Sequence, residues 1–148
     1  MTQACRLDQF LERFPLRETM PSLLAGEPGP AEAIQWIETA DRPGAVKAAL
    51  FLCFDDLEKS HAIVQDLDTP VGSYLHAIIH RREGDFSNSK YWLRRAGPIS
   101  LVENNPGYDP YDLVDRVQTA GISNPAELVG VQRIEWSRVF ALAWGEAE

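Results

Sequence analysis

The stretch DTPVGSYLHAIIHRREGDFSNSKYWLRRAG, residues 68–97, contains the start, the turn and the end of one helical hairpin. Its opening Asp-Thr-Pro is a helix start, because proline at the first helical position lacks an N–H that the helix does not need there. Gly84 suits the left-handed residue that follows a helix, and Asp85 suits the capping position of the next. Its last residue, Gly97, is followed by Pro98, and this Gly-Pro pair ends the second helix. The stretch therefore predicts two packed helices, over 71–83 and 86–96.

Residues 45–67 repeat this arrangement upstream. AVKAALFLCF is apolar almost all round, and a helix with that pattern belongs in the centre of a fold. The following Asp-Asp-Leu-Glu resembles a capping box that starts a second helix, which runs to about Leu67. The two turns lie about 30 residues apart, near the 34-residue period of tetratricopeptide repeats. Such a repeat has a turn followed by positions for small or apolar core residues. The residues of this chain that fall at those positions are Gly84, Asp85, Phe86, Ser89, Leu93 and Ala96. The match is partial, because the first turn lacks a glycine and two hairpins are fewer than three repeats.

The rest of the chain also favours helices, and no segment shows the strict alternation of a strand. Residues 4–14 could form a short first helix. Residues 15–30 hold four prolines and two glycines and are expected to form a flexible arm or linker. Further helices are expected over 31–40, 110–120 and 125–144, with a loop over 99–108. We therefore expect a single all-α domain over residues 1–148, a compact bundle of about seven helices with tetratricopeptide-like hairpins in the middle.

Composition limits the class of protein and its partners. The chain has 148 residues and a formal net charge of −8, so a nucleic-acid partner is not expected, since phosphate contacts call for a basic face. Two cysteines without a CxxC motif fit a reducing cytoplasm. The N-terminus lacks a secretory signal, and the longest apolar run is too short to span a membrane. A cytoplasmic acidic protein is expected. An aromatic stripe of Trp136, Phe140 and Trp144 suits a core or the face of a homo-oligomer.

Histidines in the hairpin are candidate metal ligands. His76, His80 and Glu83 lie on one stripe of a helix, because steps of four and three residues return to nearly the same angle. Two imidazoles and a carboxylate can bind zinc, iron or manganese, and three protein ligands with an open position are a catalytic arrangement. His61 on the preceding helix could add a ligand. The pattern equally suits core histidines that bond a carbonyl, a serine or a carboxylate.

Basic residues gather in the same hairpin, where five of the 14 lysines and arginines of this acidic chain fall within 15 positions. Arginine forks favour carboxylates and phosphates, so a small anionic ligand or an acidic partner segment could bind over residues 76–95. Alternatively, Arg81 and Arg82 pair with Glu83 and Asp85 on a solvated surface. The candidate ligand-binding residues are Arg81, Arg82, Asp85, Asn88, Lys90, Tyr91, Trp92 and Arg95.

The string HRREGDFSNSKYWLRRAG, with the upstream SYLHAII, resembles a segment of a family of small helical proteins of bacteria and fungi. In that family the string reads HxxxHRREgDxSNxKYWfRRvG. The likeness covers about residues 72–97, and Leu93 and Ala96 stand where the family has Phe and Val. The resemblance implies a shared polar site or a shared hairpin, and it does not imply a particular reaction.

Three hypotheses follow from these residues. The first is a helical binding module whose hairpin 76–95 recognises an anionic ligand or an acidic partner. The second is a metal-dependent enzyme built on His76, His80 and Glu83, with His61 as a further ligand or as a base. The third is a structural or oligomerisation protein in which the motif locks the hairpin through buried hydrogen bonds.

Overall fold

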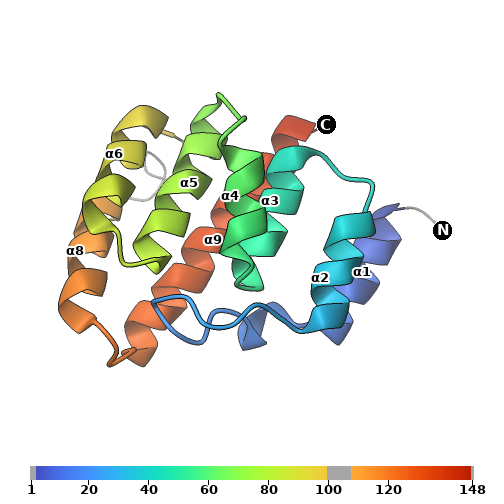
Figure 1. The fold of residues 1–148 in the computed structure, drawn as a ribbon, viewed down its shortest axis with the longest axis horizontal. Coiled ribbons are helices and arrows are strands. Elements are labelled where there is room, and N and C mark those ends of the chain that lie inside the picture. Colours follow the sequence, from blue (N-terminus) through green and yellow to red (C-terminus); the bar gives the residue numbers. More distant parts are fainter. Residues whose placement is uncertain (1–2, 100–107, 148) are drawn as a thin grey trace.

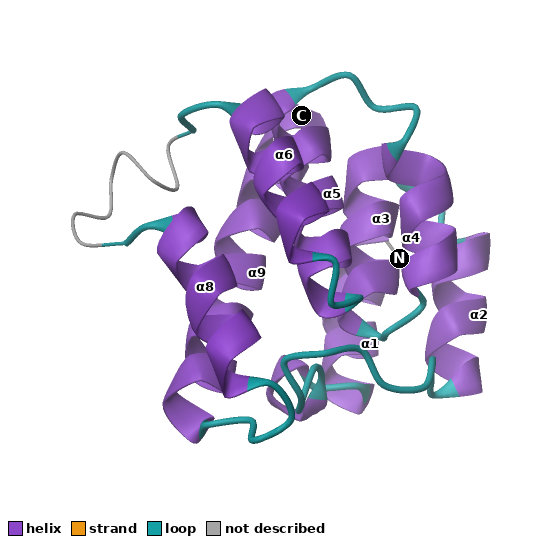
Figure 2. Cartoon of the chain, turned by 60° about the vertical axis from the view of Figure 1, so that its left-hand side comes forward, coloured by secondary structure: helices purple, strands orange, loops and turns teal. Residues whose placement is uncertain are grey.

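The computed structural model is an all-α bundle of packed helix pairs, and it describes residues 3–99 and 108–147. Eight α-helices lie in this described part, and it contains no strand (Figure 2). Their bounds are α1 Gln3–Arg13, α2 Ala31–Thr39, α3 Gly44–Cys53, α4 Leu57–Val64, α5 Pro70–Arg82, α6 Phe86–Ala96, α8 Pro110–Ala120 and α9 Ala126–Ala147. The first of them, α1, is the short helix expected over residues 4–14, and the all-α bundle of about seven helices predicted from the sequence is confirmed. Residues 100–107 of the predicted loop lie outside the described residues.

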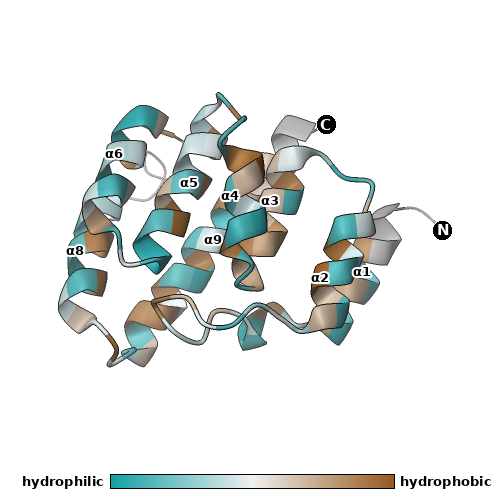
Figure 3. Ribbon diagram, viewed as in Figure 1, coloured by the Kyte–Doolittle hydropathy of each residue, from teal (hydrophilic) through white to brown (hydrophobic). Residues whose placement is uncertain are grey.

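The four middle helices form one row, in which α6, α5, α4 and α3 follow one another, and the long α9 crosses behind them (Figure 1). Seven of the ten residues of α3 are buried, which confirms that the apolar run lies in the centre of the fold (Figure 3). Trp136 of α9 is buried against this helix, and its indole Nε1–H donates to the carbonyl of Ala49 at 2.7 Å. No helix in the described ranges is long and apolar enough to cross a membrane.

The two middle hairpins, α3–α4 and α5–α6, repeat the same internal hydrogen bond. Ser60 of α4 donates its hydroxyl to the carbonyl of Ala48 at 2.7 Å, and Ser89 of α6 donates to Ala77 at 2.7 Å. Equivalent positions are 29 residues apart. Because buried hydroxyls need a partner, each serine fixes how its second helix packs on its first. The repeat expected from the turn spacing is therefore present in the packing.

Asp55 replaces the turn glycine that the first hairpin lacks. Gly84 has a φ of 83° in the second turn, and the equivalent Asp55 has a φ of 65° in the first. Aspartate tolerates the left-handed region better than most residues with a side chain. Its carboxylate also binds the guanidinium of Arg82, which is almost fully buried. The ion pair offsets part of the backbone strain and joins the first turn to the end of α5.

The segment 15–30 lies against the bundle, in contrast to the flexible arm expected from its composition. Its Leu23 and Met20 are fully buried, and the carbonyl of Ser22 accepts a hydrogen bond from Nη2 of Arg82 at 3.1 Å. The amide of Ala25 donates to the carbonyl of Arg82 at 2.8 Å. The segment begins with a short 3-10 helix, Leu16–Glu18. Prolines remove backbone donors but leave these apolar side chains and carbonyls available, so the segment packs against the bundle as a strap.

Candidate metal centre

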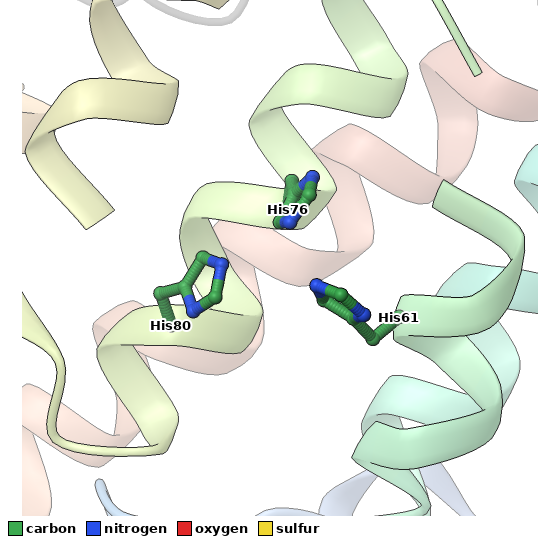
Figure 4. Close-up of side chains that lie close together, drawn as sticks. All are labelled: His61, His76 and His80. Atoms are coloured by element: carbon green, nitrogen blue, oxygen red, sulfur yellow. The ribbon is translucent and has the colours of Figure 1, made fainter. Parts of the chain in front are cut away.

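His61, His76 and His80 come together between α4 and α5. One ligand nitrogen from each histidine lies within 4.8 Å of those of the other two. Figure 4 shows the three rings pointing toward a common centre, His61 from α4 and the other two from successive turns of α5. The first hairpin thus supplies one imidazole and the second supplies two. This is the one group of three or more metal-ligating side chains found among the described residues.

The surrounding helices hold these rings in place. Thr69 caps α5, its hydroxyl accepting from the amide of Gly72 at 3.0 Å, and so fixes the start of the helix that carries both histidines. The indole of Trp92 on α6 stacks on His76 with ring centroids 3.8 Å apart. The ring of His61 meets His76 edge-on, with centroids 4.6 Å apart. Stacking of this kind restricts the ring of His76 before any ligand arrives.

His76 and His80 are held in the neutral form that binds metals. The pKa of His76 is lowered to about 4, mostly by burial and in smaller part by the neighbouring His80 and His61. Burial also lowers the pKa of His80, although the carboxylate of Glu83 acts in the opposite direction. Nδ1 of His76 is buried and has no hydrogen-bond partner within the part of the chain described. A buried imidazole nitrogen without a partner is unusual, and it contrasts with the satisfied core histidines that the sequence also allowed.

Glu83 lies beside the histidine cluster, whereas its position on the helix stripe of His76 and His80 predicted that it would be a ligand. Its Oε1 is 3.2 Å from Nδ1 of His80, and the glutamate side chain is half exposed. A carboxylate at this nitrogen favours the tautomer with the proton on Nδ1 and the lone pair on Nε2, an arrangement common behind metal-bound histidines. The sequence predicted His61 as a further ligand. In the structure His61 supplies the third ligand nitrogen of the cluster, because α4 packs directly on α5.

The two arginines after His80 are buried in separate ion pairs, so the prediction that they pair with Glu83 and Asp85 on a solvated surface is wrong. Arg81 binds both carboxylate oxygens of Glu135 on α9, at 3.0 and 2.8 Å. Arg82 binds Asp55. Charges buried this deeply require a partner. Neither guanidinium is therefore on an open face where it would meet an anion.

Glu135 is the centre of a polar network that the sequence did not reveal. Besides Arg81, it accepts hydrogen bonds from the hydroxyls of Tyr74 at 3.0 Å and Tyr108 at 2.8 Å. Burial raises the pKa of both tyrosines, and the charge of Glu135 adds to the effect, so both hydroxyls stay protonated and remain donors. The only signal in the sequence was a glutamate directly before the buried Trp136.

The remaining candidate residues of the hairpin lie on α6 or at its start. Lys90 pairs with Asp115 of α8 at 2.7 Å, and Arg95 lies 3.9 Å from Asp68. Asp85 caps α6, and Tyr91 is about half exposed. Asn88 and Trp92 contact the histidines. The anion-binding hypothesis then rests on Lys90 and Arg95, both already paired with carboxylates, and it stays a prediction.

The low pKa of His76 predicts how stability depends on pH without metal. Between the usual value of 6.5 and about 4, the unfolded chain binds a proton at this position that the folded chain does not. The free energy of unfolding should therefore fall as the pH falls through this window, by up to about 1.4 kcal/mol per pH unit for one proton. The measurement is urea unfolding between pH 7 and 4 in the presence of a chelator. His76→Phe, which keeps a ring against Trp92, should show a shallower dependence, and equal slopes would contradict the assignment.

Comparisons of the chain with protein-family models, with curated proteins and with solved structures found no match. The class of protein is therefore defined by the fold and the cluster alone. It is an all-α protein of packed helical hairpins whose central pair of helices carries a candidate three-histidine metal centre.

Proposed function

We propose that the protein binds one divalent transition-metal ion, zinc being the best match, through His61, His76 and His80. The observation that carries the proposal is the convergence of three ligand nitrogens within 4.8 Å. Two ligands that each lie about 2.1 Å from one zinc ion are about 3.4 Å apart in tetrahedral geometry. The three nitrogens would have to close from at most 4.8 Å to about this separation to share a single ion.

The electrostatics of the cluster support the same proposal. Metal ions compete with protons for imidazole, so a histidine with a depressed pKa is ready to bind at neutral pH. Three imidazoles without a thiolate suit zinc, and they suit calcium and magnesium poorly because those ions prefer oxygen ligands. Glu83, beside Nδ1 of His80, would orient that ring and raise its basicity as an outer partner of the metal.

The metal would act as a bridge between the two hairpins. His61 belongs to α4 in the first hairpin, and His76 and His80 belong to α5 in the second. Two hairpins are fewer than the three repeats that usually make a stable stack, and an ion bound across their boundary adds a contact that apolar packing does not supply. We therefore infer a metal-stabilised helical scaffold as the function of this centre.

The test is direct measurement of bound zinc. Purified, untagged protein exposed to zinc and then dialysed should retain about one ion per chain, measured by elemental analysis. The double variant His76→Ala/His80→Ala should retain none while keeping its helical circular dichroism spectrum. Gln65→Ala, an exposed position one turn after His61 on the first hairpin, is the matched control and should bind as the wild type does. A wild-type protein without zinc, or a folded double variant that keeps it, would contradict the proposal.

A further inference from the structure

Asn88, on the first turn of α6, brings a third helix to the histidine cluster. Its side-chain Nδ2 lies 3.4 Å from Nε2 of His80. Nε2 is the nitrogen with the free lone pair when Glu83 holds the proton on Nδ1, as its 3.2 Å contact favours. The amide therefore lies beside the atom of His80 that would bind the metal.

The spacing matches that of two ligands of one ion. Neighbouring ligand atoms of a tetrahedral zinc site are about 3.4 Å apart, and this is the separation between the amide of Asn88 and Nε2 of His80. The amide nitrogen and oxygen are nearly the same in size, and a half-turn of the amide exchanges them. That rotation gives up two long contacts of Nδ2, with Nε2 of His80 and with Asp85, both at 3.4 Å, and it directs Oδ1 toward the ion.

The packing of α6 holds Asn88 close to the cluster. One turn later on the same face of the helix, Trp92 stacks on His76 with centroids 3.8 Å apart. At the start of the helix, Asp85 accepts from the backbone amide of Asn88 at 3.4 Å. Both contacts place the side chain of Asn88 over His80, so a ligand from α6 would need no movement of the helix.

We propose that Oδ1 of Asn88 is the fourth ligand of the metal, so that the protein itself closes the site. This inference rests on the proposed zinc site of His61, His76 and His80. A centre with four protein ligands has no open position for a water nucleophile, and such centres stabilise a fold instead of catalysing a reaction. The ion would then join α4, α5 and α6, and the metal-dependent enzyme predicted as an alternative from the sequence would be excluded.

The test uses cobalt(II) in place of zinc, because its visible absorption bands change when an added anion enters the coordination sphere. Wild type, Asn88→Ala, Asn88→Asp and the exposed neighbour variant Ser87→Ala are loaded with cobalt and titrated with thiocyanate. The spectra of wild type and Ser87→Ala should not respond, whereas that of Asn88→Ala should, because an open position has been created. Zinc affinity should fall at least about tenfold in Asn88→Ala and rise in Asn88→Asp, where a carboxylate replaces the amide.

The outcomes separate this proposal from the one on which it rests. A wild-type spectrum that responds to thiocyanate as Asn88→Ala does would show an open position and overturn the assignment of Asn88. Unchanged zinc affinity in both Asn88 variants would overturn it as well. In either case, if His76→Ala/His80→Ala no longer binds cobalt, the proposed metal site of His61, His76 and His80 would still stand. A wild-type protein that binds no cobalt and no zinc would overturn both.

Discussion

Replacing Arg81 with methionine is expected to lower the free energy of unfolding by about 3–5 kcal/mol, the usual effect of breaking a buried ion pair by removing one partner. Arg81 and Glu135 are each only 2% exposed. Without the guanidinium, the carboxylate of Glu135 would be a buried charge with two tyrosine hydroxyls as its remaining partners. Urea unfolding monitored by circular dichroism measures the change.

A second variant shows whether the charge or the packing causes the loss. In Arg81→Met/Glu135→Gln the buried charge is absent, and the glutamine oxygen can still accept from Tyr74 and Tyr108. The double variant should therefore be more stable than Arg81→Met alone. Arg94→Met, at an exposed position of α6, controls for the substitution and should change stability by less than about 0.5 kcal/mol. If the double variant is as unstable as Arg81→Met, the loss of stability comes from the lost packing of the Arg81 side chain and not from the unpaired charge of Glu135.

Zinc is expected to raise the free energy of unfolding by about 2.7 kcal/mol when its free concentration is 100 times the Kd, and by about 4.1 kcal/mol at 1,000 times. His61→Ala should lose most of this gain, because the first hairpin would no longer reach the ion. In the presence of a chelator, the free energies of unfolding of His61→Ala and wild type should differ by much less than the gain from zinc, since His61 is only partly buried. Chemical unfolding with and without zinc measures both quantities.

Gln65→Ala, directly after the same helix, is the control for that measurement, and it should keep the full gain from zinc. An equal gain in His61→Ala and wild type would contradict a metal that bridges the hairpins. It would place the ion on α5 alone, where His76 and His80 are four residues apart.

Local signals in the sequence predicted the helices well. Asp56, Thr69 and Asp85 each accept a backbone N–H at the start of a helix, at three of the helix starts that the sequence predicted. Capping depends on residues within one turn, so it can be recognised without the rest of the chain. The hairpin repeat was visible for the same reason, because its turns and small residues recur at a constant spacing.

Partners distant in the sequence could not be predicted in this way. Arg81 and Arg82 have carboxylates two or three positions away, yet they bind residues 54 and 27 positions away. Only the packing of α9 and of the first turn on α5 brings those carboxylates within reach. The metal centre could be predicted only in part. The four-residue spacing of His76 and His80 is visible in the sequence, whereas the position of His61 depends on how α4 packs.

The segment 15–30 shows the limit of composition as a guide. Four prolines and two glycines favour a flexible arm, yet Leu23 is fully buried and its amide donates to Oδ1 of Asn124 at 2.9 Å. Proline restricts the backbone without preventing burial of its neighbours. Contacts with Arg82 and Asn124, far along the chain, determine where this segment lies.

The most direct test of the central claim is anomalous diffraction at the zinc edge from crystals of the zinc-loaded protein. We expect one strong peak between α4 and α5, about 2.0–2.1 Å from a ring nitrogen of each of His61, His76 and His80. A cluster without a peak in such crystals, with the three rings packed as they are here, would contradict the metal centre and leave the histidines as part of the core.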